Sequence, residues 1–178
     1  MLTPLEHWVE EQAQLTKPAR IRWCDGSEQE ARELIEIGIR EEKINGNPVF
    51  TKLSDRNWPN AYLHRSHPND VARTEQLTFV CHPDKATAGP NNNWMDPKEA
   101  REKMKKLFDG CMKGRTMYVM PYMMGHPKSP YAKACVQVTD STYVAVSMRI
   151  MTRMGKEALD RIGKSPDFLI QRAFSSVG

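Results

Sequence analysis

Arg73 is the side chain in this sequence whose chemistry points most directly to a ligand. It ends the segment Asp-Val-Ala-Arg at 70–73. Its planar guanidinium can hold a carboxylate through two parallel hydrogen bonds, which a lysine cannot do. Asp70 and Glu75 lie close by in the sequence and could instead form an ion pair with it. The residue types alone leave both a ligand-binding and a structural interpretation open.

Glu75 follows two positions later, so in an extended segment its side chain would project to the same side as that of Arg73. A local ion pair of Glu75 with Arg73 or Arg65 is the simple alternative to a functional role. The sequence therefore indicates a charged region around 73–75 without deciding its purpose.

Two further segments could contact anions or bases. Residues 113–116, Lys-Gly-Arg-Thr, place two cations around a glycine before an expected strand, but strand-edge or domain-contact residues are the favoured interpretation. Residues 91–94, Asn-Asn-Asn-Trp, follow Gly89 and Pro90 and favour a turn over a base-stacking surface.

Metal and phosphate sites are not indicated. His64 and His67 have no carboxylate cluster near them in the sequence and are expected at the surface, and the four cysteines form no CxxC pair. The chain also contains no GxxxxGK[ST] segment of the kind that cradles phosphates. Phosphoryl transfer needs such a loop, a lysine and a bound metal, so this chain alone is not expected to catalyse it.

The elements that must position these side chains follow from capping residues and apolar spacing. Helices are expected from Thr3–Pro4 to Thr16, after a capping box of Ser27 and Glu30, from Asp96 to about Gly110, and from Ser141 to a C-cap at Gly155. In the last of these, Met148, Met151 and Met154 are expected to form a packing stripe. Strands are expected at 21–24, 77–81, 116–122 and 132–139, with a long loop over 45–68. These elements predict an α/β fold of the α+β type, with a central mixed sheet flanked by helices.

Composition narrows the class of protein. The chain has 178 residues, 39% hydrophobic and 27% charged, with a formal charge of +4, and no apolar run long enough to span a membrane. One domain over 1–178, no membrane partner and a cytoplasmic location are expected, since the N-terminus is unlike a signal or transit peptide. The charge leaves one alternative, a stand-alone anion- or RNA-binding module, although the chain lacks an aromatic RNP pair, a GxxG loop and a basic tract.

Four blocks make the chain recognisable. They are DVARTE (70–75), AGPNNNWM (88–95), GCMKGRTMYVMPY (110–122) and SMRIMTRMG (147–155). In order and spacing they resemble the N-terminal portion of GTP-dependent phosphoenolpyruvate carboxykinase, over about Trp23 to Gly178. The resemblance implies the N-terminal domain of that fold and a part in converting oxaloacetate and GTP to phosphoenolpyruvate, GDP and CO2 in gluconeogenesis.

The resemblance also implies residue roles. Arg73 is expected to bind the carboxylate of oxaloacetate or phosphoenolpyruvate, and Glu75 to help hold a mobile lid closed. GTP and the divalent metal, Mn2+ or Mg2+, are expected to bind a C-terminal domain that this chain lacks. The resemblance therefore implies no catalytic residue and no metal ligand within 1–178, no nucleic-acid partner, and a family whose members are usually monomeric.

Overall fold

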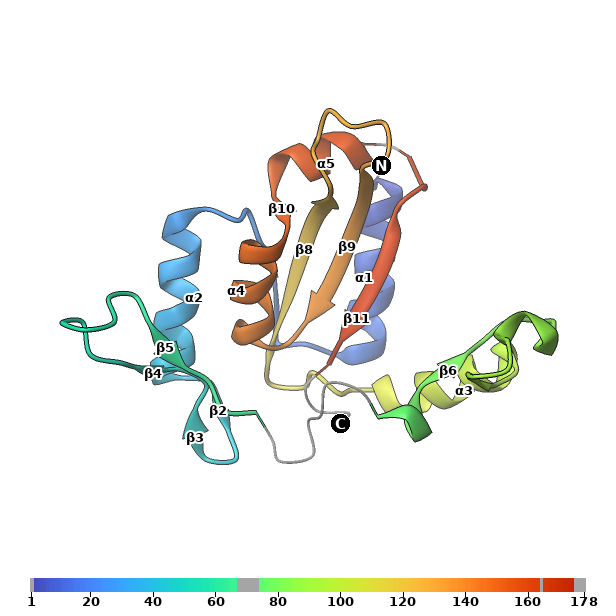
Figure 1. The fold of residues 1–178 in the computed structure, drawn as a ribbon, viewed down its shortest axis with the longest axis horizontal. Helices are drawn as coiled ribbons and strands as arrows, with labels where there is room; N and C mark the ends of the chain where they lie inside the picture. The colour runs from blue at the N-terminus through green and yellow to red at the C-terminus, as the bar shows by residue number, and fades with distance from the viewer. Residues whose placement is uncertain (1, 67–73, 164, 175–178) are drawn as a thin grey trace.

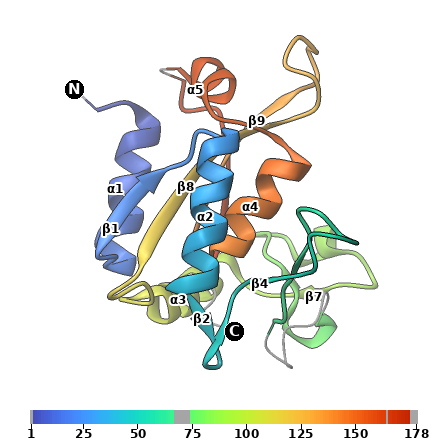
Figure 2. The same ribbon diagram turned by 90° about the vertical axis from the view of Figure 1, so that its left-hand side faces the viewer.

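The protein folds around one five-stranded mixed β-sheet with helices on both faces (Figures 1 and 2). A computed structural model describes residues 2–66, 74–163 and 165–174. The predicted α/β class, a central mixed sheet flanked by helices, is confirmed. Within the described residues, no helix combines the length and the apolar character needed to cross a bilayer.

The helices are α1 (Pro4–Thr16), α2 (Glu28–Arg40), α3 (Pro97–Phe108), α4 (Thr142–Met151) and α5 (Lys156–Ile162). The strands of the central sheet are β1 (Arg20–Trp23), β8 (Thr116–Met124), β9 (Lys133–Thr139), β10 (Arg153–Met154) and β11 (Leu169–Ala173). Short two-residue strands form three small ladders outside this sheet: β2 (Lys43–Ile44) with β3 (Asn47–Pro48), β4 (Thr51–Lys52) with β5 (Tyr62–Leu63), and β6 (Phe79–Val80) with β7 (Asn93–Trp94). Two 3-10 turns, η1 (Glu75–Leu77) and η2 (Lys85–Ala88), flank β6.

The sheet has the order β1-β8-β9-β11, and β10 pairs with β8 as well. β1 runs parallel to the first half of β8, whereas β10 runs antiparallel to its second half. β9 is antiparallel to β8 and parallel to β11, with Leu169 opposite Cys135 and Ala173 opposite Thr139. β8 is therefore the central strand, which explains why its side chains are apolar on both faces.

Alternate residues of β8 divide the core into two layers. Met117 and Val119 face α1 and pack with Leu5 and Val9 of that helix. Side chains of the opposite face, including Tyr118, Met120 and Tyr122, pack against α2 and α4. The period of two along a strand thus lets one strand line both cores. Figure 2 shows α1 on one side of the sheet and the pair α2 and α4 on the other.

Capping bonds confirm three of the four predicted helix starts, at Thr3, Ser27 and Asp96, whereas Ser141 begins α4 without a side-chain capping bond. Thr3 and Glu6 form a complete capping box on α1. Ser27 accepts the backbone N–H of Glu30 at the start of α2. The carboxylate of Glu30 does not return to Ser27, however, because it accepts the backbone N–H groups of Asp25 and Gly26 at 2.9 and 2.8 Å. The expected box on α2 is thus half formed, and Glu30 closes the preceding turn instead.

The expected end of α4 is wrong. The helix stops at Met151, because the backbone of Thr152 is extended (φ −132°, ψ 178°), while its N–H makes the last helical bond to the carbonyl of Met148. The chain then enters β10, and Gly155 begins α5 with φ of +98° rather than closing α4. A Cβ at Gly155 would lie 2.1 Å from the carbonyl oxygen of Asp25, so only glycine fits this crossing.

Other expectations need smaller corrections. Of the methionine stripe, Met148 is buried and Met154 packs partly buried against the same core cluster, but Met151 is 65% exposed. The strand expected at 77–81 shrinks to β6, because Leu77 lies in η1. The loop at 45–68 contains the short strands β3, β4 and β5. Neither α5 nor β11 was among the predicted elements.

Candidate functional site

The segment that carries Arg73, residues 67–73, lies outside the described residues. The first candidate of the sequence therefore has no position to report, and the same holds for His67. The structure describes the residues on either side of this segment, and these include His64 upstream and Glu75 downstream.

His64 is held in place by three contacts on the upstream side. Its ring stacks on Tyr143 of α4 with centroids 3.7 Å apart and planes inclined by 14°. Its Nδ1 lies 2.8 Å from the carbonyl oxygen of Val49, and the Phe50 ring lies 6.1 Å away. The expectation of a surface histidine thus holds only in part for His64, because its half-buried ring packs between the 49–50 segment and α4.

Glu75 begins η1 on the downstream side, and its backbone is anchored by a neighbouring element. The amide nitrogen of Asn93 donates to the carbonyl oxygens of Glu75 and Thr78, at 2.6 and 3.2 Å. Within the part of the chain that the structure describes, no cation forms an ion pair with the Glu75 carboxylate, and this includes Arg65. The exposed Glu75 side chain is therefore not committed to the Arg65 pair that the sequence left open.

The Asn-Asn-Asn-Trp segment is a structural anchor rather than a stacking surface. Asn92 donates to the carbonyl of Ala88 at 2.8 Å, which agrees with the expected turn, but the next two residues form β7. The Trp94 indole N–H donates to the carbonyl of His82 at 2.7 Å, and the Lys85 ammonium lies 5.9 Å from the ring centroid. Both hydrogen bonds tie this turn to its own neighbours.

Arg115, a candidate anion contact in the sequence, forms an ion pair inside the protein. Its Nη2 lies 2.5 Å from a carboxylate oxygen of Asp140, whose side chain is completely buried at the end of β9. A buried carboxylate needs such a partner to remain charged. This geometry supports the strand-edge interpretation of residues 113–116.

A second carboxylate lies in the same polar cluster and was not singled out from the sequence. Glu42 accepts the backbone N–H of Thr142 at 3.0 and 3.3 Å, at the start of α4. Burial raises the pKa of Glu42, and the nearby charge of Asp140 adds to this effect. Burial, followed by the charge of Glu42, also raises the pKa of Tyr118 to about 12. Glu42 carried no local signal, because its partner is 100 positions away.

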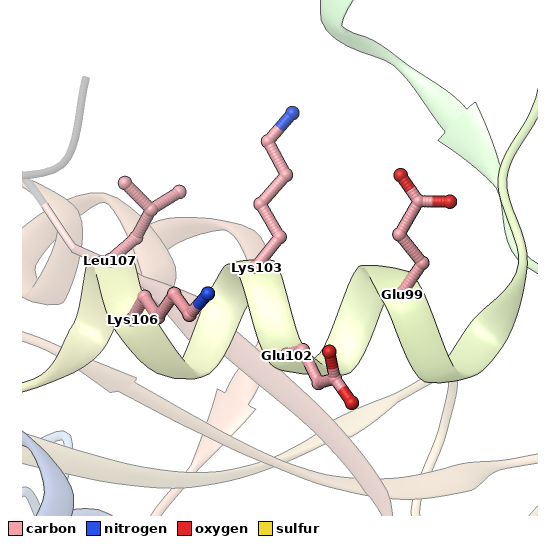
Figure 3. Close-up of a pocket in the computed structure, with 5 residues that line it drawn as sticks. All are labelled: Glu99, Glu102, Lys103, Lys106 and Leu107. Carbon is pink, nitrogen blue, oxygen red and sulfur yellow. The ribbon is translucent and has the colours of Figure 1, made fainter.

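A hollow along α3 does not add a site. It is lined by side chains of that single helix, namely Glu99, Glu102, Lys103, Lys106 and Leu107. Figure 3 shows these side chains extending outward from the helix instead of converging on a point. No group of three or more metal-ligating side chains is found within 2–66, 74–163 and 165–174. The described residues thus do not fit a divalent metal.

Comparison with known proteins gives the family. Residues 7–178 match the model of the phosphoenolpyruvate carboxykinase N-terminal domain. A protein from Anaeromyxobacter dehalogenans (strain 2CP-C), named phosphoenolpyruvate carboxykinase [GTP], is 53% identical over 161 residues, which are 90% of this chain and 26% of the relative.

Proteins of the same name from Corynebacterium jeikeium and Chlamydia muridarum are 46% and 44% identical, over 97% and 98% of this chain. The match covers 27% and 28% of their length, so the chain spans about a quarter of each relative. Since the family model and these relatives match the chain over nearly its whole length, the chain belongs to the phosphoenolpyruvate carboxykinase N-terminal domain family.

Proposed function

We propose that this chain is the N-terminal, substrate-binding part of a GTP-dependent phosphoenolpyruvate carboxykinase. The observation that carries the proposal is the 53% identity over 90% of the chain to a protein of that name. The reaction is the decarboxylation of oxaloacetate coupled to phosphorylation of the resulting enolate by GTP, which yields phosphoenolpyruvate, GDP and CO2. We also propose that the protein is located in the cytoplasm.

In this proposal Arg73 binds the carboxylate of oxaloacetate or phosphoenolpyruvate. The guanidinium neutralises the substrate and fixes its orientation by two hydrogen bonds, so that its effect falls on turnover as well as on affinity. On the two sides of the Arg73 segment, the ring of His64 stacks on Tyr143 of α4, and the backbone of Glu75 is bonded to Asn93 of β7. Glu75, exposed and without an ion pair among the described residues, is proposed to contact the lid.

The chemistry of phosphoryl transfer is assigned to the rest of the enzyme. GTP supplies the phosphoryl group and Mn2+ or Mg2+ stabilises its charge, but the described residues contain no cluster that would bind the metal. We therefore propose that 1–178 acts as one N-terminal domain whose partner is a C-terminal nucleotide- and metal-binding domain. The chain alone is expected to be inactive.

A chimera tests this proposal. This chain would replace the aligned N-terminal quarter of the Anaeromyxobacter dehalogenans relative, and GTP-dependent formation of phosphoenolpyruvate from oxaloacetate would be measured. The chimera should be active, and Arg73→Ala should lower kcat/KM by about 100-fold or more, since a charged double hydrogen bond contributes roughly 3 kcal/mol. Arg73→Lys should recover only part of the loss, because a lysine cannot bind in a bidentate manner.

Arg65→Ala is the matched control, since it removes an exposed arginine eight positions away. It should leave kcat/KM within about twofold, because screened surface charges contribute little. Equal losses in the two variants would mean that general positive charge, not a carboxylate contact at Arg73, supports activity. A chimera with normal activity after Arg73→Ala would remove Arg73 from the substrate site.

A further inference from the structure

Asn45 and Gly46 form the turn of the β2–β3 hairpin. Ile44 and Asn47 are paired on either side of them, so the loop has two residues. Both φ angles are positive, +51° for Asn45 and +80° for Gly46, as in a type I′ turn. Figure 1 shows this hairpin projecting beyond the end of α2, away from the central sheet. Both turn residues are exposed, so water reaches the whole turn.

An asparagine that precedes a glycine places an electrophile beside a nucleophile. The backbone nitrogen of the glycine loses its proton and attacks the side-chain Cγ of the asparagine, which closes a succinimide ring and releases ammonia. Water then opens one of the two ring carbonyls and yields aspartate or isoaspartate. One water is consumed and one ammonia is released, so the step needs no further reactant. Glycine favours the attack because it has no Cβ to obstruct the ring.

Both reacting groups of this turn are free of hydrogen bonds within the described residues. Neither the Asn45 side-chain amide nor the Gly46 N–H forms one, and the Asn47 amide donates to the backbone carbonyl of Asn45, at 3.4 Å. A Cβ built on Gly46 would have no atom within 4 Å, so the space around this residue is open. The attack therefore has no competing bond to break.

The fold blocks the two other pairs of this chemical type. Asp25–Gly26 and Asp109–Gly110 would form the same ring by losing water in place of ammonia. In the first pair the glycine N–H donates to the Glu30 carboxylate at 2.8 Å, and in the second it donates to the carbonyl of Leu15 at 2.8 Å. A nitrogen engaged in this way must lose its hydrogen bond before it can attack. The hairpin pair is thus the reactive one of the three.

The hairpin can also reach the conformation that ring closure needs. β2 and β3 are two residues long, and they form a ladder of their own outside the central sheet. A ladder this short opens at a low cost in free energy. Rotation about the backbone of Asn45 then brings its Cγ to the nitrogen of Gly46. Ring closure therefore does not require the core to unfold.

We propose that Asn45 is a site of spontaneous deamidation, and that its isoaspartate product weakens the link between this hairpin and α4. Isoaspartate adds one methylene group to the backbone. A two-residue turn with this addition no longer holds Ile44 in register with Asn47. The inference is independent of the proposed function.

The base of the hairpin connects the turn with α4. The Val49 N–H donates to the backbone carbonyl of Glu42 at 3.2 Å and closes the hairpin. The Glu42 carboxylate in turn accepts the N–H of Thr142 at the start of α4, at 3.0 Å. A displaced β2 or β3 strand therefore moves the acceptor that caps this helix.

Ageing of the chain at mildly alkaline pH, followed by peptide mapping with mass spectrometry, tests the modification. The peptide that contains Asn45 should gain the mass that accompanies exchange of NH2 for OH. Asn60 is an internal control, since it is exposed and has a φ of +58°, but the Ala61 N–H after it donates to the carbonyl of Trp58 at 3.2 Å. Asn45 should react at least about tenfold faster than Asn60, because that bond and the Cβ of Ala61 both oppose ring closure.

Two variants identify the reacting side chain. Asn45→Gln should abolish the mass gain in this peptide, because glutamine would have to close a larger ring. Asn47→Gln makes the same exchange two positions away and should leave the mass gain unchanged. Equal rates at Asn45 and Asn60 would overturn the assignment of the site, and so would isoaspartate that forms at Asp25 or Asp109 before it forms at Asn45.

Urea unfolding of the aged chain tests the link with α4. The isoaspartate form should have a lower urea midpoint than the Asn45→Asp variant, which carries the same charge on an unaltered backbone. This difference should shrink in the Glu42→Ala background, because the cap is already absent there. Equal midpoints would refute the link, and a difference of unchanged size in Glu42→Ala would refute its path through Glu42.

Discussion

Glu42 allows a sharp test of how the two halves of the chain are joined. Its carboxylate accepts the backbone N–H of Thr142 at the first turn of α4. Ser141, the N-cap residue, makes no side-chain capping bond, so a residue 100 positions away takes over this role. Replacing Glu42 should therefore weaken α4 even though the helix itself is unchanged.

The expected magnitude follows from the groups left behind. Glu42→Ala leaves the N–H of the fully buried Thr142 without this acceptor, which costs about 1–3 kcal/mol. Loss of a helix N-cap costs about 1 kcal/mol of stability, and because the cap is this same hydrogen bond, the two costs are not added. Removing a partly buried charge recovers some of this loss. We expect Glu42→Ala to lower the free energy of unfolding by about 2 kcal/mol, and Glu42→Gln, which keeps an acceptor oxygen, by less than about 1 kcal/mol.

The pH dependence has a definite sign. Because burial raises the pKa of Glu42 in the folded state above its ordinary value of 4.5, the folded protein binds this proton more tightly than the unfolded chain does. The stability that Glu42 contributes is then fully present below pH 4.5 and is lost as the pH rises through the folded pKa. Wild type should therefore lose stability relative to Glu42→Gln as the pH rises through this window.

Urea unfolding at a series of pH values measures both quantities. Equal costs for the Ala and Gln variants would refute the hydrogen bond to Thr142 as the source of stability. A difference between wild type and Glu42→Gln that stays flat, or that grows in favour of wild type with rising pH, would show that the Glu42 pKa is not raised.

Two further predictions concern the packing at Gly155 and the contact of α4 with the turn that precedes α2. Gly155→Ala should lower the free energy of unfolding by about 3 kcal/mol or more, since its Cβ would overlap the carbonyl of Asp25. Gly114→Ala is also at positive φ but has open space around it, so it should lower this free energy by only about 1–2 kcal/mol. Equal losses for the two variants in urea unfolding would exclude the overlap. Arg149 donates its Nε–H to the carbonyl of Gly26 at 2.9 Å. Arg149→Met should therefore lower the free energy of unfolding by about 1–2 kcal/mol. An unchanged midpoint of urea denaturation would show that this bond contributes nothing to stability.

Local sequence signals were sufficient for helices α1 to α4 and for strands β1, β8 and β9. Thr3, Ser27 and Asp96 mark helix starts because their side chains bond backbone groups within three residues, and such short-range bonds can be read directly from the sequence. The apolar run of β8 likewise predicted a buried strand. The four motif blocks identified the family, which the comparison with known proteins confirmed over residues 7–178.

The errors occur where distant groups decide the local structure. Gly155 looked like a helix C-cap, but pairing of the preceding residues with β8 and the close approach of Asp25 make it the start of α5. His64 is half-buried rather than fully exposed, because Tyr143 of α4 stacks on its ring. Neither effect leaves a trace within a few residues of the position concerned.

What the sequence determined by itself is the set of short-range caps, the alternation of the central strand and the family. What only the tertiary structure decided is which charges are already engaged: Arg115 by Asp140, and Glu42 by the start of α4. The physical reason is range, because caps and strand periodicity act within a few residues, whereas a buried charge is set by whatever partner the fold brings beside it. The same rule separates Asn45–Gly46 from the two Asp–Gly pairs, because only the fold determines which glycine N–H is already bonded.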